Sequence, residues 1–123
     1  MLADARARLQ RLEPEDVRAA LENDGAILID IRQDYQLAAD GVVPGALLIH
    51  RNVLEWRCDP SSGGHDARVG GLDRRVVVMC DEGYTSSLAA VALQELGFAR
   101  VTDLDGGFQA WRAAGLPVQP RPG

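Results

Sequence analysis

The sequence contains little cysteine and no long run of apolar residues. Its two cysteines, Cys58 and Cys80, are too few for a disulfide framework in 123 residues, so we expect a reducing, cytoplasmic setting. No apolar run approaches the roughly 20 residues that a membrane-spanning helix needs. The first residues show no apolar stretch after their charges, so we expect no signal peptide.

Positive charge is also scarce. The formal net charge is −5 and the isoelectric point is about 4.9. These values argue against binding to nucleic acid, which needs a basic face, and against binding to anionic membranes. His50 and His65 are far apart and belong to no cluster of metal ligands, so we expect no metal site. Hydrophobic residues make up 46% of the chain and charged residues 25%, which is typical of one globular domain with its own core.

Predicted strands alternate with helical patterns along the chain. The strands are expected at 26–31, 46–49, 76–79 and 100–104. The runs at 26–31 and 76–79 show no apolar–polar alternation, which indicates strands that are covered on both faces. The alternation predicts an α/β fold: a parallel sheet of about five strands with right-handed crossovers and helices on both faces. Cys80 would end a strand near the centre of that sheet.

A single domain is expected over residues 13–117. It follows an N-terminal extension, 1–12, whose apolar residues indicate a short helix and then a brief strand. Pro14 stands at a first-turn position before two acidic residues, which predicts the first helix of the domain. A Pro-rich tail, 118–123, is expected to fray.

The stretch around Cys80 carries the strongest chemical signal. The cysteine stands between the strand predicted at 76–79 and a helix predicted at 87–96. The first turn of a helix leaves N–H groups unpaired at the positive end of its dipole, which favours the thiolate of a nearby cysteine. Gly83 permits a sharp turn, and Ser86 is placed to cap the helix. A free cysteine is also often a small core side chain, but the loop favours a nucleophile.

Four segments of the chain resemble signatures of the rhodanese (sulfurtransferase) family. They are Cys80-x-x-Gly83-x-Thr85-Ser86; Asp103-Leu-Asp-Gly-Gly-Phe-Gln-Ala-Trp111 with Gly115-Leu-Pro117 after it; Leu28-Ile-Asp-Ile-Arg32; and Gly41-Val-Val-Pro-Gly-Ala46. Together they extend from about Glu13 to Pro117, nearly the whole chain. The resemblance implies a single-domain rhodanese-like fold.

The resemblance also implies a reaction. Cys80 would attack the outer sulfur of a donor and become a persulfide, and an acceptor thiol would then remove that sulfur. This scheme needs no cofactor and no metal. Its partners are a small-molecule or protein sulfur donor and a thiol acceptor. The implied active-site loop after the cysteine consists of Asp81, Glu82, Gly83, Tyr84, Thr85 and Ser86.

Charged residues at two other strand ends are candidates for the pocket, because the C-terminal ends of strands line the site in open α/β sheets. Asp30 and Arg32 end the first strand, and the resemblance implies that they shape and support the pocket. A turn cap and a surface ion pair are the alternative for these two. Arg51 and Arg57 follow the second strand and are candidates for the positive charge of the pocket, with solvated arginines as the alternative.

Other functions fit parts of the pattern. A phosphatase loop of this kind places arginine six residues after the cysteine, to hold phosphate with two hydrogen bonds, and here that residue is Ser86. A non-catalytic binding or regulatory module would not need the cysteine. A thiol redox protein would need the long loop at 58–71 to bring Cys58 within disulfide reach of Cys80.

Asp81 and Glu82 bear on the choice of sulfur donor. Many loops of this family carry neutral or basic residues beside the cysteine, whereas this loop carries two carboxylates. Negative charge beside a thiolate repels an anionic donor. We therefore expect thiosulfate to be a poor donor. We also expect the two side chains to point outward, with their backbone N–H groups facing the sulfur.

Overall fold

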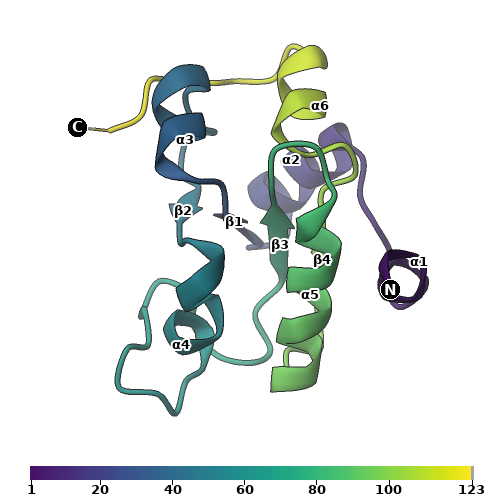
Figure 1. Cartoon of the computed structure of the whole chain (residues 1–123), viewed down its shortest axis with the longest axis vertical. Helices are drawn as coiled ribbons and strands as arrows, with labels where there is room; N and C mark the ends of the chain where they lie inside the picture. Colours follow the sequence, from purple (N-terminus) through teal and green to yellow (C-terminus); the bar gives the residue numbers. More distant parts are fainter. Residues whose placement is uncertain (123) are drawn as a thin grey trace.

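The computed structural model describes residues 1–122 and shows one parallel sheet (Figure 1). Its strands, in the order β2-β1-β3-β4, are β1 (Ile27–Asp30), β2 (Leu47–Leu48), β3 (Val76–Met79) and β4 (Val101–Asp103). The predicted α/β fold is therefore confirmed, with four strands instead of about five. The brief strand expected in the extension is a single parallel bridge between Leu12 and Leu104. It ends there because Pro14 already begins the next helix.

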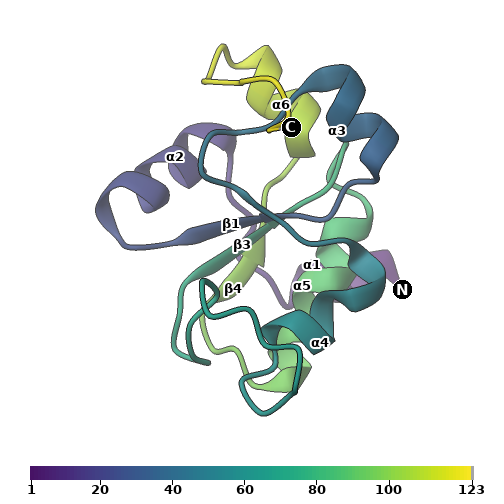
Figure 2. The same ribbon diagram turned by 90° about the vertical axis from the view of Figure 1, so that its left-hand side faces the viewer.

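Helices cover both faces of the sheet, as the sequence predicted. They are α1 (Leu2–Ala7), α2 (Pro14–Asn23), α3 (Asp34–Asp40), α4 (Leu54–Cys58), α5 (Thr85–Leu96) and α6 (Gly107–Ala113), with a 3₁₀ turn η1 (Arg51–Val53) before α4. Figure 2 shows α2 and α6 on one side of the sheet and α4 and α5 on the other. No helix among residues 1–122 has both the length and the apolar character needed to cross a bilayer.

The central strand β3 anchors the core on both faces. Val76 and Val78 pack with the side chains of α4 and α5, whereas Val77 and Met79 pack with those of α2 and α6. All four are completely buried. Burying side chains of this size contributes about 1.5–3 kcal/mol each, so the position of the strand is firmly determined. The residue that follows it, Cys80, is thereby held at the C-terminal edge of an internal strand.

The chain between α4 and β3 is pinned by an acidic side chain. Asp66 is 6% exposed and accepts hydrogen bonds from Arg68 at 2.7 Å and from Arg57 at 3.4 Å. The bond to Arg68 opposes the effect of burial and lowers the pKa of Asp66 to about 2. Ion pairs of this kind hold a long loop that has little apolar surface of its own.

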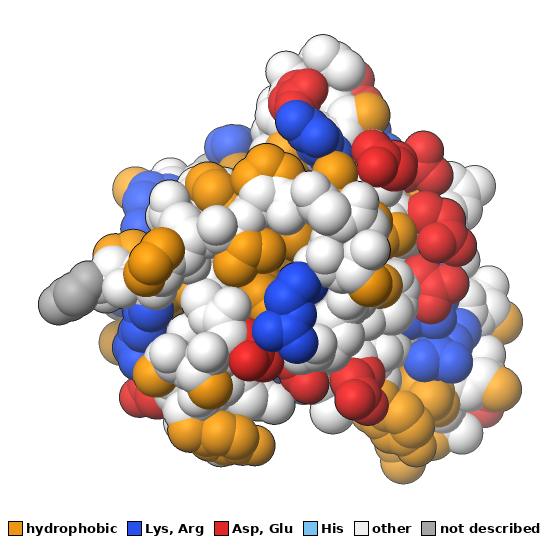
Figure 3. Space-filling model, turned by 90° about the horizontal axis from the view of Figure 1, so that it is seen from above, with side chains coloured by type: hydrophobic (Ala, Val, Ile, Leu, Met, Phe, Trp, Pro, Cys, Tyr) orange, Lys and Arg blue, Asp and Glu red, His pale blue; other side chains and the backbone are white. Residues whose placement is uncertain are grey.

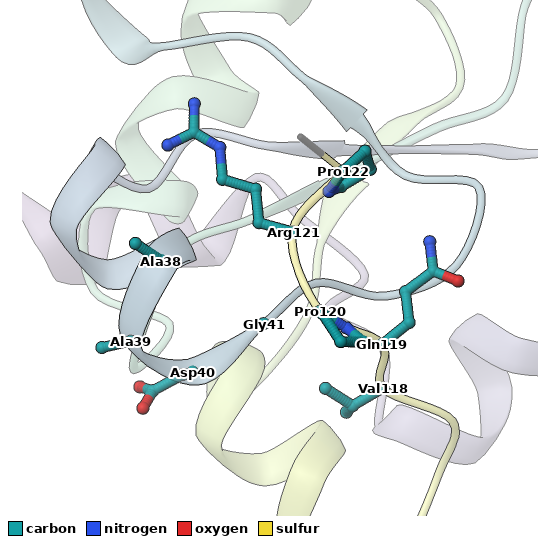
Figure 4. A pocket seen from close by; sticks show the side chains of 9 residues that line it. All are labelled: Ala38, Ala39, Asp40, Gly41, Val118, Gln119, Pro120, Arg121 and Pro122. Carbon is teal, nitrogen blue, oxygen red and sulfur yellow. The ribbon is translucent and has the colours of Figure 1, made fainter.

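The C-terminal tail pairs with another segment through Gln119 and Arg121, so the expectation that it frays is wrong at these two residues. The backbone N–H of Val42 donates to the Gln119 carbonyl at 2.7 Å, and the Gln119 N–H donates to the Val42 carbonyl at 2.8 Å. Arg121 also donates to Asp34 at 3.0 Å. Figure 4 shows the tail beside the end of α3, where the two segments border a shallow pocket. Residue 123 lies outside the described residues.

Candidate active site

The sulfur of Cys80 is held inside the loop between β3 and α5. Its Sγ atom accepts hydrogen bonds from the backbone N–H groups of Gly83 at 3.2 Å and Ser86 at 3.4 Å. Cys80 is 6% exposed, so the sulfur is largely shielded while it still borders a pocket. Amides directed at the sulfur, together with the positive end of the α5 dipole, favour a negative charge on it. The strand–cysteine–loop–helix arrangement predicted from the sequence is therefore present.

Ser86 does not cap α5, contrary to expectation. The helix begins at Thr85, two residues before the predicted start at Ser87, and its N-cap residue Tyr84 makes no side-chain capping bond. The hydroxyl of Ser86 instead donates to Asp103 at 2.8 Å, and Ser87 donates to the same carboxylate oxygen, also at 2.8 Å. These bonds fasten the first turn of α5 to the end of β4.

The start of α6 supports the loop from behind. The N–H groups of Phe108 and Gln109 donate to the carbonyls of Cys80 and Asp81 at 2.9 and 3.0 Å. A Cβ atom on Gly107 would lie 2.5 Å from the Cys80 carbonyl oxygen, and Gly107 has a φ of +62°. Only glycine suits both that close approach and that backbone conformation. The paired glycines, which the sequence indicated only as a turn, are thus part of the loop's support.

Arginines of the N-terminal extension also contact the loop, and sequence reasoning missed them. Arg6 and Arg11 both donate to the carbonyl oxygen of Gly83, at 2.9 and 2.8 Å. Arg11 also forms two hydrogen bonds to the completely buried Asp103, at 2.9 and 3.1 Å. Burial alone would lower the pKa of Arg11. The hydrogen bond and the charge of Asp103 outweigh burial, so the pKa of Arg11 is raised above its ordinary value and Arg11 stays charged. The one available signal was an acidic residue at a strand end, Asp103.

Asp30 and Arg32 form a buried ion pair beneath the pocket. Their side chains are fully inaccessible and 2.8 Å apart, and Arg32 also donates to the Gly41 carbonyl at 2.8 Å. The guanidinium carbon lies 3.8 Å from the ring centroid of Phe108, an attractive cation–π distance. Arg32 Nη1 is the one buried side-chain nitrogen or oxygen among the described residues that has no hydrogen-bond partner. Because Asp30 neutralises Arg32, the pair leaves little net charge for an anionic substrate.

A pocket of about 1190 Å³ opens beside Cys80. It is lined by the segment 31–36 after β1, by His50, Arg51 and Asn52, and by Cys80, Asp81, Glu82, Tyr84 and Thr85. Arg51 is among these lining residues, whereas Arg57, the other arginine expected here, is not. Arg57 does not line this pocket; it donates to the Gly64 carbonyl at 3.1 Å and to Asp66. It lies on the last turn of α4, facing the 58–71 loop.

Acidic groups offset the positive charge of the pocket. Arg51 is paired with Glu55 at 2.7 Å, and His50 contacts Asp34 at 3.1 Å. Glu82 is exposed, as expected, but Asp81 is half-buried and accepts a hydrogen bond from Gln109 at 2.9 Å. Viewed from the end of the molecule that carries α3 and α6, basic side chains form separate patches between apolar and acidic ones (Figure 3).

Cys58 is a core side chain. It ends α4, is completely buried, and packs with β1, β3 and α5 side chains. Burial, reinforced by the charges of Asp66 and Glu55, raises the pKa of the Cys58 thiol to about 12. It is therefore neutral at ordinary pH. It does not border the Cys80 pocket.

The fold and the cysteine loop define a class of protein. The profile of the rhodanese-like domain family matches residues 13–114, and the chain belongs to that family. Thiosulfate sulfurtransferase GlpE of Pseudomonas aeruginosa is 38% identical over 104 residues, which make up 85% of this chain and 84% of that protein. The protein of the same name from Pseudomonas fluorescens is 32% identical over 106 residues, 86% and 87% of the two chains.

Solved structures show the same fold. A protein of unknown function from Rhodopseudomonas palustris, described as a possible tyrosine phosphatase, is 32% identical with a TM-score of 0.88. That match covers 96% of this chain and 90% of the other. A thiosulfate sulfurtransferase of Pseudomonas aeruginosa is 26% identical with a TM-score of 0.73, over 94% of this chain and 21% of the other. The sulfurtransferase relatives support an enzyme of the rhodanese type.

Proposed function

We propose that this protein is a sulfurtransferase that carries sulfane sulfur as a persulfide on Cys80. The observation that carries the proposal is the pair of backbone N–H groups, from Gly83 and Ser86, directed at a sulfur that borders the open pocket. Such preorganised donors stabilise a negative sulfur without reorganisation. Relatives named thiosulfate sulfurtransferases support the reaction class.

The reaction has two covalent steps. The Cys80 thiolate attacks the outer sulfur of the donor, forming an S–S bond, and the rest of the donor leaves with the electron pair of the bond that breaks. The thiolate of an acceptor then attacks the outer sulfur of the persulfide. The Cys80 thiolate leaves with the electron pair of its S–S bond, and the acceptor keeps the sulfur. No electrons are gained or lost overall. At each stage the backbone N–H groups of the loop face an anionic sulfur.

The two carboxylates at the edge of the pocket, Asp81 and Glu82 (the acidic rim), favour a sulfur donor with less charge than thiosulfate. A carboxylate about 7 Å from the reacting sulfur opposes each negative charge by about 2.4 kcal/mol at an effective dielectric of ~20, and by about 0.6 kcal/mol in bulk water. Asp81 and Glu82 both border the pocket, and Arg51 is already paired with Glu55. The donor is thus a less charged sulfane compound, or a persulfide on a small molecule or protein.

A phosphatase activity fits this loop poorly. Phosphoryl transfer at such a loop uses a planar arginine fork, and the residue six positions after Cys80 is Ser86, whose hydroxyl is bonded to Asp103. A redox pair with Cys58 also fits poorly, because that thiol is buried and lies outside the pocket. A binding module without turnover would leave the amide contacts to Cys80 without a role.

The test compares sulfur transfer by the intact protein and two variants. A persulfide donor and a thiol acceptor are supplied, and the transferred sulfur is measured over time. Cys80→Ser should keep its circular dichroism spectrum and lose transfer, and Cys58→Ala should retain it. Transfer at the original rate by folded Cys80→Ser would rule out this function.

A further inference from the structure

The carbonyl oxygen of Gly83 is held by two arginines that lie far away in the sequence. Arg6 Nη2 and Arg11 Nη2 donate to it at 2.9 and 2.8 Å. Both residues precede position 13, where the match to the family profile begins. The N-terminal extension therefore grips the cysteine loop from outside the matched region.

The direction of this carbonyl determines the direction of the next amide. All peptide bonds among the described residues are trans, and in a planar trans peptide the C=O and the following N–H point in opposite directions. With the Gly83 carbonyl turned toward the two arginines, the N–H of Tyr84 is turned away from them. Gly83 has a φ of +81°, and glycine pays little for rotating such a peptide. A rotated peptide would direct its carbonyl dipole at the side where the N–H now points.

The contact between the two arginines and the Gly83 carbonyl is connected to a buried carboxylate. Asp103 is completely buried and receives hydrogen bonds from Arg11 and from the hydroxyls of Ser86 and Ser87. Arg6 Nε also lies 3.3 Å from the Ser87 hydroxyl oxygen. The same two arginines thus connect the Gly83 carbonyl to the first turn of α5, which supplies the Ser86 N–H to Cys80.

We propose that Arg6 and Arg11 are positioning residues that hold the Gly83–Tyr84 peptide with its carbonyl turned toward them, and so fix the loop whose Gly83 and Ser86 N–H groups bind the Cys80 sulfur. This inference deepens the proposed sulfurtransferase and rests on it for its catalytic consequence. The two guanidinium groups also place positive charge behind the loop, which favours an anion within it. The anionic forms of Cys80, thiolate and persulfide, are the species that gain from this arrangement.

The test uses the variants Arg6→Gln and Arg11→Gln and the double variant that carries both substitutions. Arg11→Lys retains the positive charge but lacks the planar guanidinium group. Arg8→Gln is the matched control, because Arg8 belongs to the same extension but is exposed. Alkylation of Cys80 by iodoacetamide is followed against pH in a Cys58→Ala background, and kcat and KM are measured with a persulfide donor. Thermal unfolding is recorded for each variant.

We expect the double variant to move the midpoint of the alkylation profile up by about one pH unit. Its kcat should fall about tenfold with little change in KM. Arg11→Lys should recover part of the shift, and Arg8→Gln should match the parent. If the double variant does not fold, Arg6→Gln alone tests the proposal, and we expect it to shift the alkylation midpoint by a smaller amount.

A variant that melts at a lower temperature but keeps the parent's alkylation midpoint and kcat would reduce the arginines to a structural tether and overturn the proposal. Alkylation requires no sulfur transfer, so the two proposals fail separately. A shifted midpoint in a protein that takes up no sulfur would refute the sulfurtransferase and keep the positioning role.

Discussion

Gly107 lies so close to Cys80 that a Cβ atom on it would be 2.5 Å from the Cys80 carbonyl oxygen. The nearest backbone atoms of Asp81 would be 2.7 Å away. This contact seats the first turn of α6 against the loop, where its N–H groups hold the Cys80 and Asp81 carbonyls. The support behind the sulfur therefore requires glycine at position 107.

Gly107→Ala should destabilise the protein and disable the loop. We expect a loss of about 2–5 kcal/mol, because the left-handed backbone costs about 1–2 kcal/mol for alanine and forced overpacking about 1–3 kcal/mol. Gly115→Ala is the matched control: Gly115 has a φ of +76°, but its Cβ would meet no atom within 4 Å. Chemical denaturation and transfer assays measure both. Equal losses in the two variants would show that the contact with Cys80 is unimportant.

The two cysteines should differ sharply in reactivity. Cys58 is completely buried, and its thiol pKa of about 12 keeps it protonated at neutral pH. Iodoacetamide should therefore label native protein once, on Cys80, and label Cys58 only after unfolding. Peptide mapping by mass spectrometry locates the label. Labelling of Cys58 in the native state would contradict its place in the core and revive the redox alternative.

Asp66 should make stability depend on acid pH. Its pKa of about 2 lies below the ordinary 3.8, so its contribution is present above pH 4 and is lost as the pH falls through about 2. Asp66→Asn should cost on the order of 1–2 kcal/mol at pH 7, since the exposed side of the Arg68 pair is screened by solvent.

The difference between Asp66→Asn and the parent should shrink toward pH 2, as measured by urea denaturation. Asp73→Asn, at an exposed position after the same loop, should change little at either pH. A difference that is independent of pH would mean that the side chain acts by packing instead of by charge.

The acidic rim should select against thiosulfate. Replacing Asp81 and Glu82 with Asn and Gln should raise kcat/KM for thiosulfate several-fold at low ionic strength and less at high salt, because salt screens the repulsion. The control replaces Glu15 and Asp16, exposed on α2, in the same way and removes the same charge elsewhere. A gain of equal size in the control would assign the effect to net charge and not to the rim.

The parts of the site that lie close together in the sequence could be predicted from it. The β-branched run at Val76–Met79, a cysteine and an Ala/Leu-rich stretch indicated a strand, a loop and a helix by local preferences. The helix begins at Thr85 instead of at the predicted Ser87. Alternation of strands and helices likewise indicated the parallel sheet.

Contacts between distant segments could not be predicted. Arg6 and Arg11 reach Gly83 across 77 and 72 residues, and no periodicity records such a pairing. Arg57 looked like a pocket residue because it follows β2, but it is hydrogen-bonded to Gly64 and Asp66 in the following loop and does not line the pocket. The tail looked frayed from its prolines, although Gln119 still offers both backbone groups to Val42.

Cys80 should carry the transferred sulfur, and mass spectrometry tests this directly. The protein is incubated with a persulfide donor, freed of excess donor and analysed by intact mass and peptide mapping. We predict a gain of one sulfur atom per chain on the peptide that contains Cys80. A thiol should remove this sulfur, and Cys80→Ser should not acquire it. No gain with any sulfane donor, or a gain that persists in Cys80→Ser, would contradict it.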